Sequence, residues 1–202
     1  SSISPVTSQE VAAKLAERGV EMLDAPVSGG QEKAQKGTLA IMVGGKQEVF
    51  DRCKKLLETM GNTITHMGNI GAGQTTKLVN QVMVAVNIAA VAEGLVLGKK
   101  AGVDPRRIFD AIEGGLAGSQ CLLDKAPRMF EGQYEPGFKI RLHIKDLNNV
   151  LETSRELGVA MPLSSQVMEM MKVLSADDYG EADHGALALF YEKLNSTVLK
   201  EN

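Results

Sequence analysis

GAGQTTKLVNQVMVAVNIAAVAEGLVLGKKAG, residues 71–102, is the stretch around which the rest of the chain is organised. It opens on glycines and threonines, contains no proline, and carries a mainly apolar run over residues 82–92. This pattern predicts a long helix that ends near Gly102. Lys77 places an amine in the first turns of that helix, just before the apolar part. Taken by itself, a lone lysine near a helix start is typical of a solvated surface residue.

The residues before this segment follow an α/β pattern. Helical stretches alternate with short strand patterns, the helices at residues 5–18, 31–37 and 46–60 and the strands at residues 20–25, 38–43 and 62–67. After about Asn69 every periodic segment has helical spacing. The sequence therefore predicts an α/β part over residues 1–69 and an all-helical domain over residues 70–202, built around the long helix.

Composition narrows the class of protein. The chain has 202 residues, is 44% hydrophobic and 23% charged, and carries a formal net charge of -3, which is typical of a soluble globular protein. Acids and bases are interspersed, so there is no basic surface for a nucleic-acid backbone and nucleic acid is not an expected partner. The cysteines and histidines stand apart in sequence, at Cys53, Cys121, His66, His143 and His184. They indicate neither a disulfide framework nor a metal site, and a reducing cytoplasm fits best.

The long helix is the one candidate for a membrane span. Asn80, Gln81, Asn87 and Glu93 interrupt its apolar run, so we expect a helix buried on most sides, within the fold or against another subunit, and no membrane. Small residues at Gly94, Gly98 and Gly102 would let a second helix approach closely. One interpretation is therefore a non-catalytic helical association module that forms a homo-oligomer.

Three segments are candidates for chemistry. The loop at residues 26–30, PVSGG, offers a serine hydroxyl and backbone N–H groups. The GxGxxxK pattern at residues 71–77 has the wrong spacing for a phosphate-binding loop, so Lys77 is expected to act as an amine, with Asn80 and Gln81 beside it. Lys145 and Asp146 lie near a predicted helix start, where a lysine is mildly unfavourable and hints at a ligand.

Together, DAPVSGG at residues 24–30, GxGxxxKxxN at residues 71–80 and HIKDL at residues 143–147 resemble the β-hydroxyacid dehydrogenase family, which includes 3-hydroxyisobutyrate dehydrogenase. The resemblance covers the whole chain. Longer matches, such as GTLAIMVGG and ADHGALALFYEKL, are similar to the members that reduce tartronate semialdehyde to D-glycerate with NAD(P)H. 3-Hydroxyisobutyrate dehydrogenase or a related activity is the alternative that these motifs share.

The resemblance implies roles for individual residues. Lys77 falls on the catalytic lysine, which as general acid protonates the carbonyl oxygen while hydride reaches the carbon. Ser28, Gly29 and Gly30 fall on the loop that holds the substrate carboxylate. Many members carry asparagine where this chain has Gln81, so Gln81 or its neighbour Asn80 is expected to contact the substrate.

The same resemblance implies a site for the cofactor. Lys145 matches a lysine that contacts it, Ser2 matches a hydroxyl residue near the nicotinamide ribose, and Asp146 steadies the Lys145 region.

One family feature is missing from the sequence. Members begin with a strand and a GxGxMG turn that holds the cofactor pyrophosphate, and these 202 residues contain no such motif. We therefore expect residues 1–69 to be the C-terminal part of a Rossmann-type domain without its phosphate-binding half, followed by a helical domain similar to the C-terminal domain of 6-phosphogluconate dehydrogenase. Such a piece is expected to bind NAD or NADP poorly, to turn over little, and to leave open which of the two cofactors and which aldehyde the whole enzyme uses.

Overall fold

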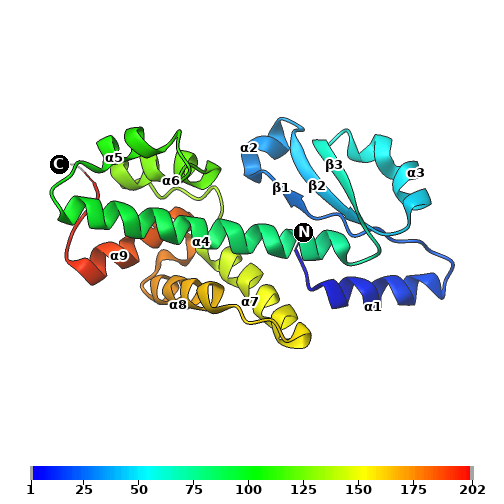
Figure 1. Cartoon of the computed structure of the whole chain (residues 1–202). Coiled ribbons are helices and arrows are strands. Elements are labelled where there is room, and N and C mark those ends of the chain that lie inside the picture. The colour runs from blue at the N-terminus through cyan, green and yellow to red at the C-terminus, as the bar shows by residue number, and fades with distance from the viewer. Residues whose placement is uncertain (1, 201–202) are drawn as a thin grey trace. The chain divides into compact units, whose positions relative to one another are not determined.

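The structure is a computed structural model that describes residues 2–200 (Figure 1). The chain packs as two compact units, one made of residues up to 81 together with 146–160, and one made of residues 82–145 together with those from 161 on. Each is described by itself below. The units are defined by how their residues pack within the chain, and the domain boundary expected near residue 69 stays a prediction.

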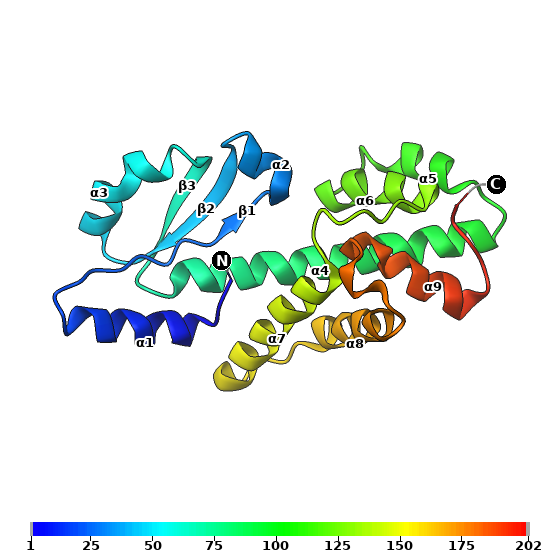
Figure 2. The ribbon, with the colours of Figure 1, turned by 180° about the vertical axis from the view of Figure 1, so that it is seen from behind.

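The first unit contains a small mixed sheet. Its strands are β1 (Val27–Ser28), β2 (Leu39–Gly44) and β3 (Gly61–Gly68), in the order β1-β2-β3. β1 pairs antiparallel with β2, and β2 pairs parallel with β3, as the side-by-side strands in Figure 2 show. A parallel pair needs a crossover connection, and α3 (Gln47–Leu57) supplies it.

Apolar side chains of β2 and α3 form the core of this sheet. Leu39, Ile41 and Val43 alternate along β2 and pack with Phe50 and Leu57 of α3. The alternation places one face of the strand against the crossover helix, which is why this segment is a strand and not a loop. The remaining helices of this part are α1 (Pro5–Ala16) and the short α2 (Gly30–Gln35).

The prediction of a strand at residues 20–25 is wrong. The structure has only a single bridge there, in which Asp24 and Gly44 exchange backbone hydrogen bonds of 3.0 and 2.8 Å. A ladder needs successive residue pairs, and Pro26, two residues on, has no N–H to donate. The predicted strands at residues 38–43 and 62–67 are confirmed, as β2 and β3.

The predicted long helix is confirmed as α4 (Ala72–Lys100), whose 29 residues make it about 43 Å long at 1.5 Å per residue. Gly102 follows its end with a φ of +81°, the left-handed conformation that ends many helices. α4 is the one helix in the described part of the chain that is long and apolar enough to cross a membrane by length and composition.

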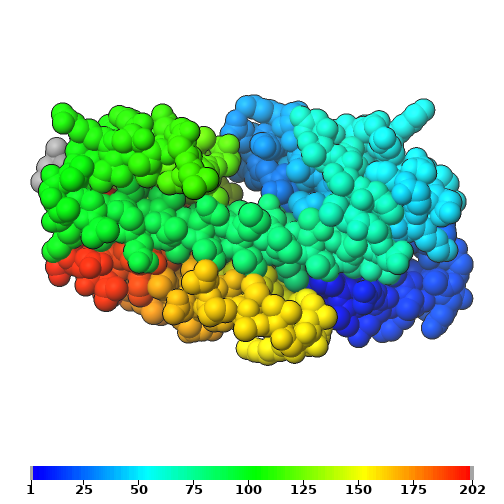
Figure 3. All heavy atoms as spheres, in the orientation of Figure 1, coloured from blue at the N-terminus to red at the C-terminus, as the bar shows by residue number. Residues whose placement is uncertain are grey.

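Within this chain one side of α4 is exposed, and its other sides are buried or half-buried. Val79, Met83 and Leu97 are 54%, 60% and 72% exposed, and α4 contributes to the surface in Figure 3. These positions share one side of the helix, since they follow its period of 3.6 residues. The other expectation, that a second subunit covers this side, stays a prediction.

The second unit is helical. Besides most of α4 it contains α5 (Pro105–Ile112), α6 (Gln120–Glu131), the start of α7 (Ile140–Leu157), α8 (Pro162–Ala176) and α9 (Leu187–Asn195). Asp104 and Ser119 cap α5 and α6, accepting from the N–H groups of Arg106 and Leu122. α6 continues through Pro127 to Glu131, although a proline at this position is expected to disturb it.

Candidate functional site

Lys77 lies in the second turn of α4, and the side chain of Asp24 caps this helix. The Asp24 carboxylate accepts from the N–H groups of Gly71 and Gln74, each at 2.6 Å, and only 3% of Asp24 is exposed. A carboxylate satisfies two of the N–H groups that a helix start leaves open and favours its positive end. α4 therefore begins at a fixed place on the sheet.

Lys77 is buried, although its position in the sequence alone suggests a surface residue. It is 8% exposed, although lysine is rarely buried without a polar environment. Gln81, one turn further along α4, is 4% exposed and lies on the same side of the helix. α4 thus holds an amine and an amide side by side within the first unit.

The predicted substrate loop begins in β1 with Ser28 and turns through Gly29 and Gly30. The two glycines have φ angles of +138° and +67°, and a Cβ on Gly29 would lie 2.7 Å from the side chain of Lys33. Only glycine adopts this conformation without strain. That this loop holds a substrate carboxylate stays a prediction.

Hydrogen bonds connect this loop to α4 and α7. The Ser28 hydroxyl donates to Asn80 Oδ1 at 3.4 Å, Asn80 Nδ2 donates to Gln81 Oε1 at 2.9 Å, and Gln81 Nε2 donates to Asp146 Oδ2 at 2.7 Å. The Ser2 hydroxyl donates to the other oxygen of Asp146. We call Ser28, Asn80, Gln81 and Asp146 the polar chain. It brings together four predicted site residues, with Ser2 at its end.

The structure places Lys145 differently from its neighbour. Asp146 is 1% exposed, whereas Lys145 is exposed in the second turn of α7. Lys145 belongs to the second unit and Asp146 to the first. The structure therefore brings Asp146 into the polar chain and leaves Lys145 on the surface of α7.

Sequence reasoning missed a second buried polar cluster, in the helical unit. Lys125 Nζ lies 3.0 Å from Asp183 Oδ1, and the other Asp183 oxygen accepts from the N–H groups of Gly137 and Phe138 at 3.0 Å. His184 Nδ1 lies 2.9 Å from His143 Nδ1. The interpretation of these histidines as isolated is therefore wrong, because the fold joins positions that are 41 residues apart.

In this cluster the pKa values of a histidine and of an aspartate are both lowered. Burial lowers the pKa of His184, and the nearby charges of His143 and Lys125 lower it further. Burial acts to raise the pKa of Asp183, but His184, Lys125 and the backbone N–H groups of Gly185 and Phe138 outweigh it, so that the pKa lies below its usual value. No group of three or more potential metal-binding side chains occurs among residues 2–200.

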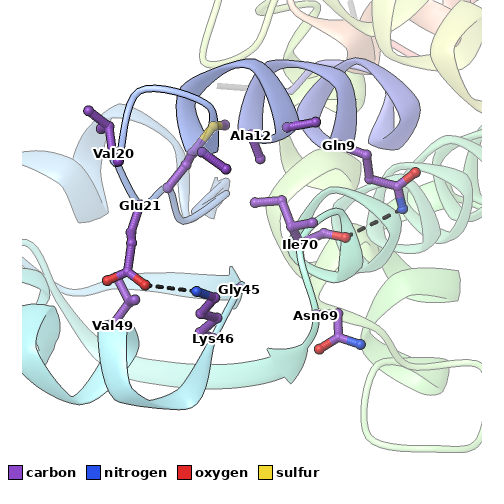
Figure 4. A pocket seen from close by; sticks show the side chains of 13 residues that line it. Gln9, Ala12, Val20, Glu21, Gly45, Lys46, Val49, Asn69 and Ile70 are labelled. Atoms are coloured by element: carbon purple, nitrogen blue, oxygen red, sulfur yellow. Dashed lines mark hydrogen bonds and ion pairs between the residues drawn. The ribbon is translucent and has the colours of Figure 1, made fainter.

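A cavity of about 730 Å³ lies elsewhere in the first unit, between α1 and the start of α3 (Figure 4). Ala12, Val20 and Ile70 give it apolar walls, and a Glu21–Lys46 ion pair of 3.0 Å lies at its edge. None of the predicted site residues lines it. The cavity is thus a feature separate from the polar chain.

The residues predicted to contact a nicotinamide cofactor, Ser2 and Lys145, belong to different units, and their role stays a prediction. Ser2 has the hydroxyl and Lys145 the ammonium that can hold ribose and phosphate oxygens. The glycine-rich start of α4 does not fit a pyrophosphate, because the Asp24 carboxylate takes its N–H groups and repels a second anion. The GxGxxxK segment is therefore not a phosphate loop, as its spacing predicts.

Two family models and several known proteins match this chain. Residues 71–191 match a family model described as the NAD-binding domain of NADP-dependent 3-hydroxyisobutyrate dehydrogenase, and residues 1–68 match the NAD-binding domain of 6-phosphogluconate dehydrogenase. The 2-hydroxy-3-oxopropionate reductase of Escherichia coli K12 is 45% identical over 187 residues, which are 93% of this chain and 64% of the relative. L-threonate dehydrogenase of Cupriavidus necator is 33% identical over 92% of this chain and 63% of its own length.

A solved structure has the same fold. The 3-hydroxyisobutyrate dehydrogenase of Mycobacterium tuberculosis, determined with L-serine, superposes with a TM-score of 0.88 at 33% identity, over 94% of this chain and 67% of the other. The chain thus spans somewhat less than two thirds of the length of the first two relatives. Matches to both family models and to these relatives show that the chain belongs to the β-hydroxyacid dehydrogenase family of NAD(P)-dependent oxidoreductases.

Proposed function

We propose that the protein containing this chain reduces 2-hydroxy-3-oxopropanoate, tartronate semialdehyde, to D-glycerate, with Lys77 as the proton donor. The observation that carries the proposal is the buried lysine on α4, one turn before an amide that the polar chain connects to the SGG loop. The 45% identity to a reductase named for this substrate supports the choice of aldehyde. 3-Hydroxyisobutyrate and threonate relatives make a related hydroxyacid the alternative.

When bound, NAD(P)H would supply the hydride for the aldehyde carbon. Lys77, as an ammonium, hydrogen-bonds the carbonyl oxygen and gives it a proton as negative charge develops there. Its low exposure strengthens this interaction, since water competes less for the charge. In the reverse direction the neutral amine takes the proton of the alcohol.

Substrate orientation falls to the loop at residues 28–30. The backbone N–H groups of Gly29 and Gly30 would hold the carboxylate, and Asn80 and Gln81, which are hydrogen-bonded to each other, would lie beside the substrate. Ser2 and Lys145 would contact the cofactor, which is NAD or NADP. Asp146 holds Ser2 through its hydroxyl.

We also propose that residues 1–69 are the C-terminal part of a Rossmann-type domain. The parallel β2–β3 pair with its crossover helix supports this, as does the match of residues 1–68 to an NAD-binding domain. α1 buries only Pro5 and Ser8, and the cavity beside it is the kind of surface that further strands would cover. Titration of NADH into the 202-residue chain tests the consequence: micromolar binding would show that the chain needs no further segment to hold the cofactor.

The role of Lys77 is tested by Lys77→Ala in the intact protein. Loss of a general acid lowers kcat by about 10²–10⁴-fold. Lys55→Ala, an exposed lysine on α3, is the matched control and is expected to leave kcat unchanged. A Lys77→Ala enzyme with near wild-type kcat would exclude the assigned role.

A second proposal concerns association through α4. One side of α4 exposes Met83, Ala90, Gly94 and Leu97. Met83 and Leu97 are equally far from Ala90 along the sequence. Two copies of this helix crossing antiparallel at Ala90 would therefore pair Met83 with Leu97 of the partner, as a two-fold axis requires. The isolated chain would then be an oligomerisation module as well as part of a cytoplasmic enzyme. Light scattering of Ala90→Arg tests this, with a monomeric wild type counting against it.

A further inference from the structure

The direction of hydrogen bonding along the polar chain is set at its Asp146 end. A carboxylate only accepts, and Asp146 accepts from Ser2 at one oxygen and from Gln81 at the other. Gln81 must therefore present its amide nitrogen to Asp146 and its amide oxygen to Asn80. The reverse orientation would put two acceptors against each other.

The same constraint passes to the next amide. Because Gln81 Oε1 accepts, Asn80 must present Nδ2 to it and Oδ1 to Ser28. The Ser28 hydroxyl hydrogen then points at Asn80, so that towards a ligand the Ser28 oxygen can only accept. In this arrangement the Ser28 hydroxyl oxygen is an acceptor, whereas the backbone N–H groups of its neighbours Gly29 and Gly30 are donors.

We propose that Asp146 is a positioning residue which, through Gln81 and Asn80, makes Ser28 an acceptor for the C2 hydroxyl group of the substrate. The inference rests on the proposed function, in which the loop beside Ser28 holds the carboxylate attached to C2. A substrate with a methyl group at C2 has no hydrogen to donate there. Asp146 thereby sets a preference for 2-hydroxy over 2-methyl substrates without touching either.

The test compares two alcohols that differ only at C2. D-glycerate carries a hydroxyl there and 3-hydroxyisobutyrate a methyl group, so their affinities for the intact protein, measured by calorimetric titration, isolate one hydrogen bond. One such bond corresponds to roughly a tenfold ratio of Kd in favour of D-glycerate. Asp146→Asn, whose side chain can donate or accept, is expected to reduce that ratio to about threefold or less.

Four further variants separate positioning from general damage. Ser28→Ala removes the acceptor and is expected to reduce the ratio equally, and Asp146→Asn added to Ser28→Ala is expected to reduce it no further, because both act on one contact. Gln81→Met interrupts the polar chain and provides the same result if Asp146→Asn does not fold. Asp110→Asn, an exposed acid of α5, is the control that leaves the ratio unchanged.

The possible results distinguish a positioning role of Asp146 from a merely structural one. Equal weakening of both ligands by Asp146→Asn, with the ratio preserved, would overturn the inference and leave only a structural role. A wild-type protein that binds 3-hydroxyisobutyrate as tightly as D-glycerate would overturn it too. Reduction of 2-hydroxy-3-oxopropanoate is measured separately. If the wild-type protein reduces it but Asp146→Asn leaves the ratio of the two Kd values unchanged, this inference alone is refuted. If the wild-type protein does not reduce it but Asp146→Asn lowers the ratio, the proposed function alone is refuted.

Discussion

Replacing Asp24 by asparagine removes the charge that holds the start of α4. The carboxylate accepts from Gly71 and Gln74 at 2.6 Å each, and neither contact can be remade by rotation. Gly44 and Gly73 approach so closely that a Cβ on either would lie 2.3 or 2.8 Å from an Asp24 oxygen. The asparagine side chain must therefore occupy the same place, where its NH₂ faces one of the two N–H donors.

The expected loss follows from the two contacts. A hydrogen bond to a charged group contributes about 1.5–3 kcal/mol, and a negative charge at a helix start a further 0.3–1 kcal/mol or so. Losing one bond together with the charge lowers the free energy of unfolding by about 2–4 kcal/mol. At about 2–4 °C per kcal/mol for a chain of this size, Tm falls by roughly 4–16 °C.

Urea unfolding followed by circular dichroism measures this difference. Asp51→Asn is the matched control, since Asp51 is exposed and its hydrogen bond to Gln47 lies on the surface of α3. It is expected to change the free energy of unfolding by less than about 0.5 kcal/mol. If Asp24→Asn changed it no more than Asp51→Asn, the carboxylate would not be what fixes α4.

Three more outcomes are expected. Gly73→Ala puts a Cβ 2.4 Å from a backbone oxygen of β2 and lowers the free energy of unfolding by about 1–3 kcal/mol in the same urea assay. Lys125→Met leaves the buried Asp183 charge without its ammonium and costs about 3–5 kcal/mol, whereas Lys139→Met breaks an exposed pair and costs at most about 1 kcal/mol, so similar losses would contradict the burial argument. Burial lowers the pKa of His184, so below the ordinary histidine pKa of 6.5 the unfolded chain binds more protons than the folded one. The urea midpoint is therefore expected to be lower at pH 5 than at pH 7. A midpoint that stays constant over that range would refute this.

The local sequence pattern is enough to predict the long helix, but not the contact that fixes the start of this helix. Glycines before residue 75, the absence of proline and the closing Gly102 are signals within one segment, and α4 follows them to within a few residues. Asp24 caps this helix from 47 residues away, which no periodicity reveals. The same limit explains the wrong strand at residues 20–25, because strand formation depends on a partner's register and not on composition alone.

The site shows the same division. Motif resemblance points to Ser28, Asn80, Gln81 and Asp146, and the structure joins them, but only coordinates show which atom donates at each step. Gln81 and Asp146 are 65 positions apart. From the sequence, glutamine in place of the usual asparagine suggests a change in substrate contact, whereas in the structure Gln81 donates to Asp146 while Asn80 lies next to Ser28.

The first turns of α4 are attached at two points by carboxylates. Asp24 takes the N–H of Gln74, and Asp146 takes the side chain of Gln81, seven residues and about 10 Å further along the helix. One anchor fixes the helix along its axis, and the second prevents rotation about that axis. Lys77 lies between these two residues of the helix, so the position of its backbone depends on both carboxylates. Loss of either anchor is therefore expected to lower kcat more than it raises KM, because a proton donor displaced by about 1 Å loses rate rather than binding.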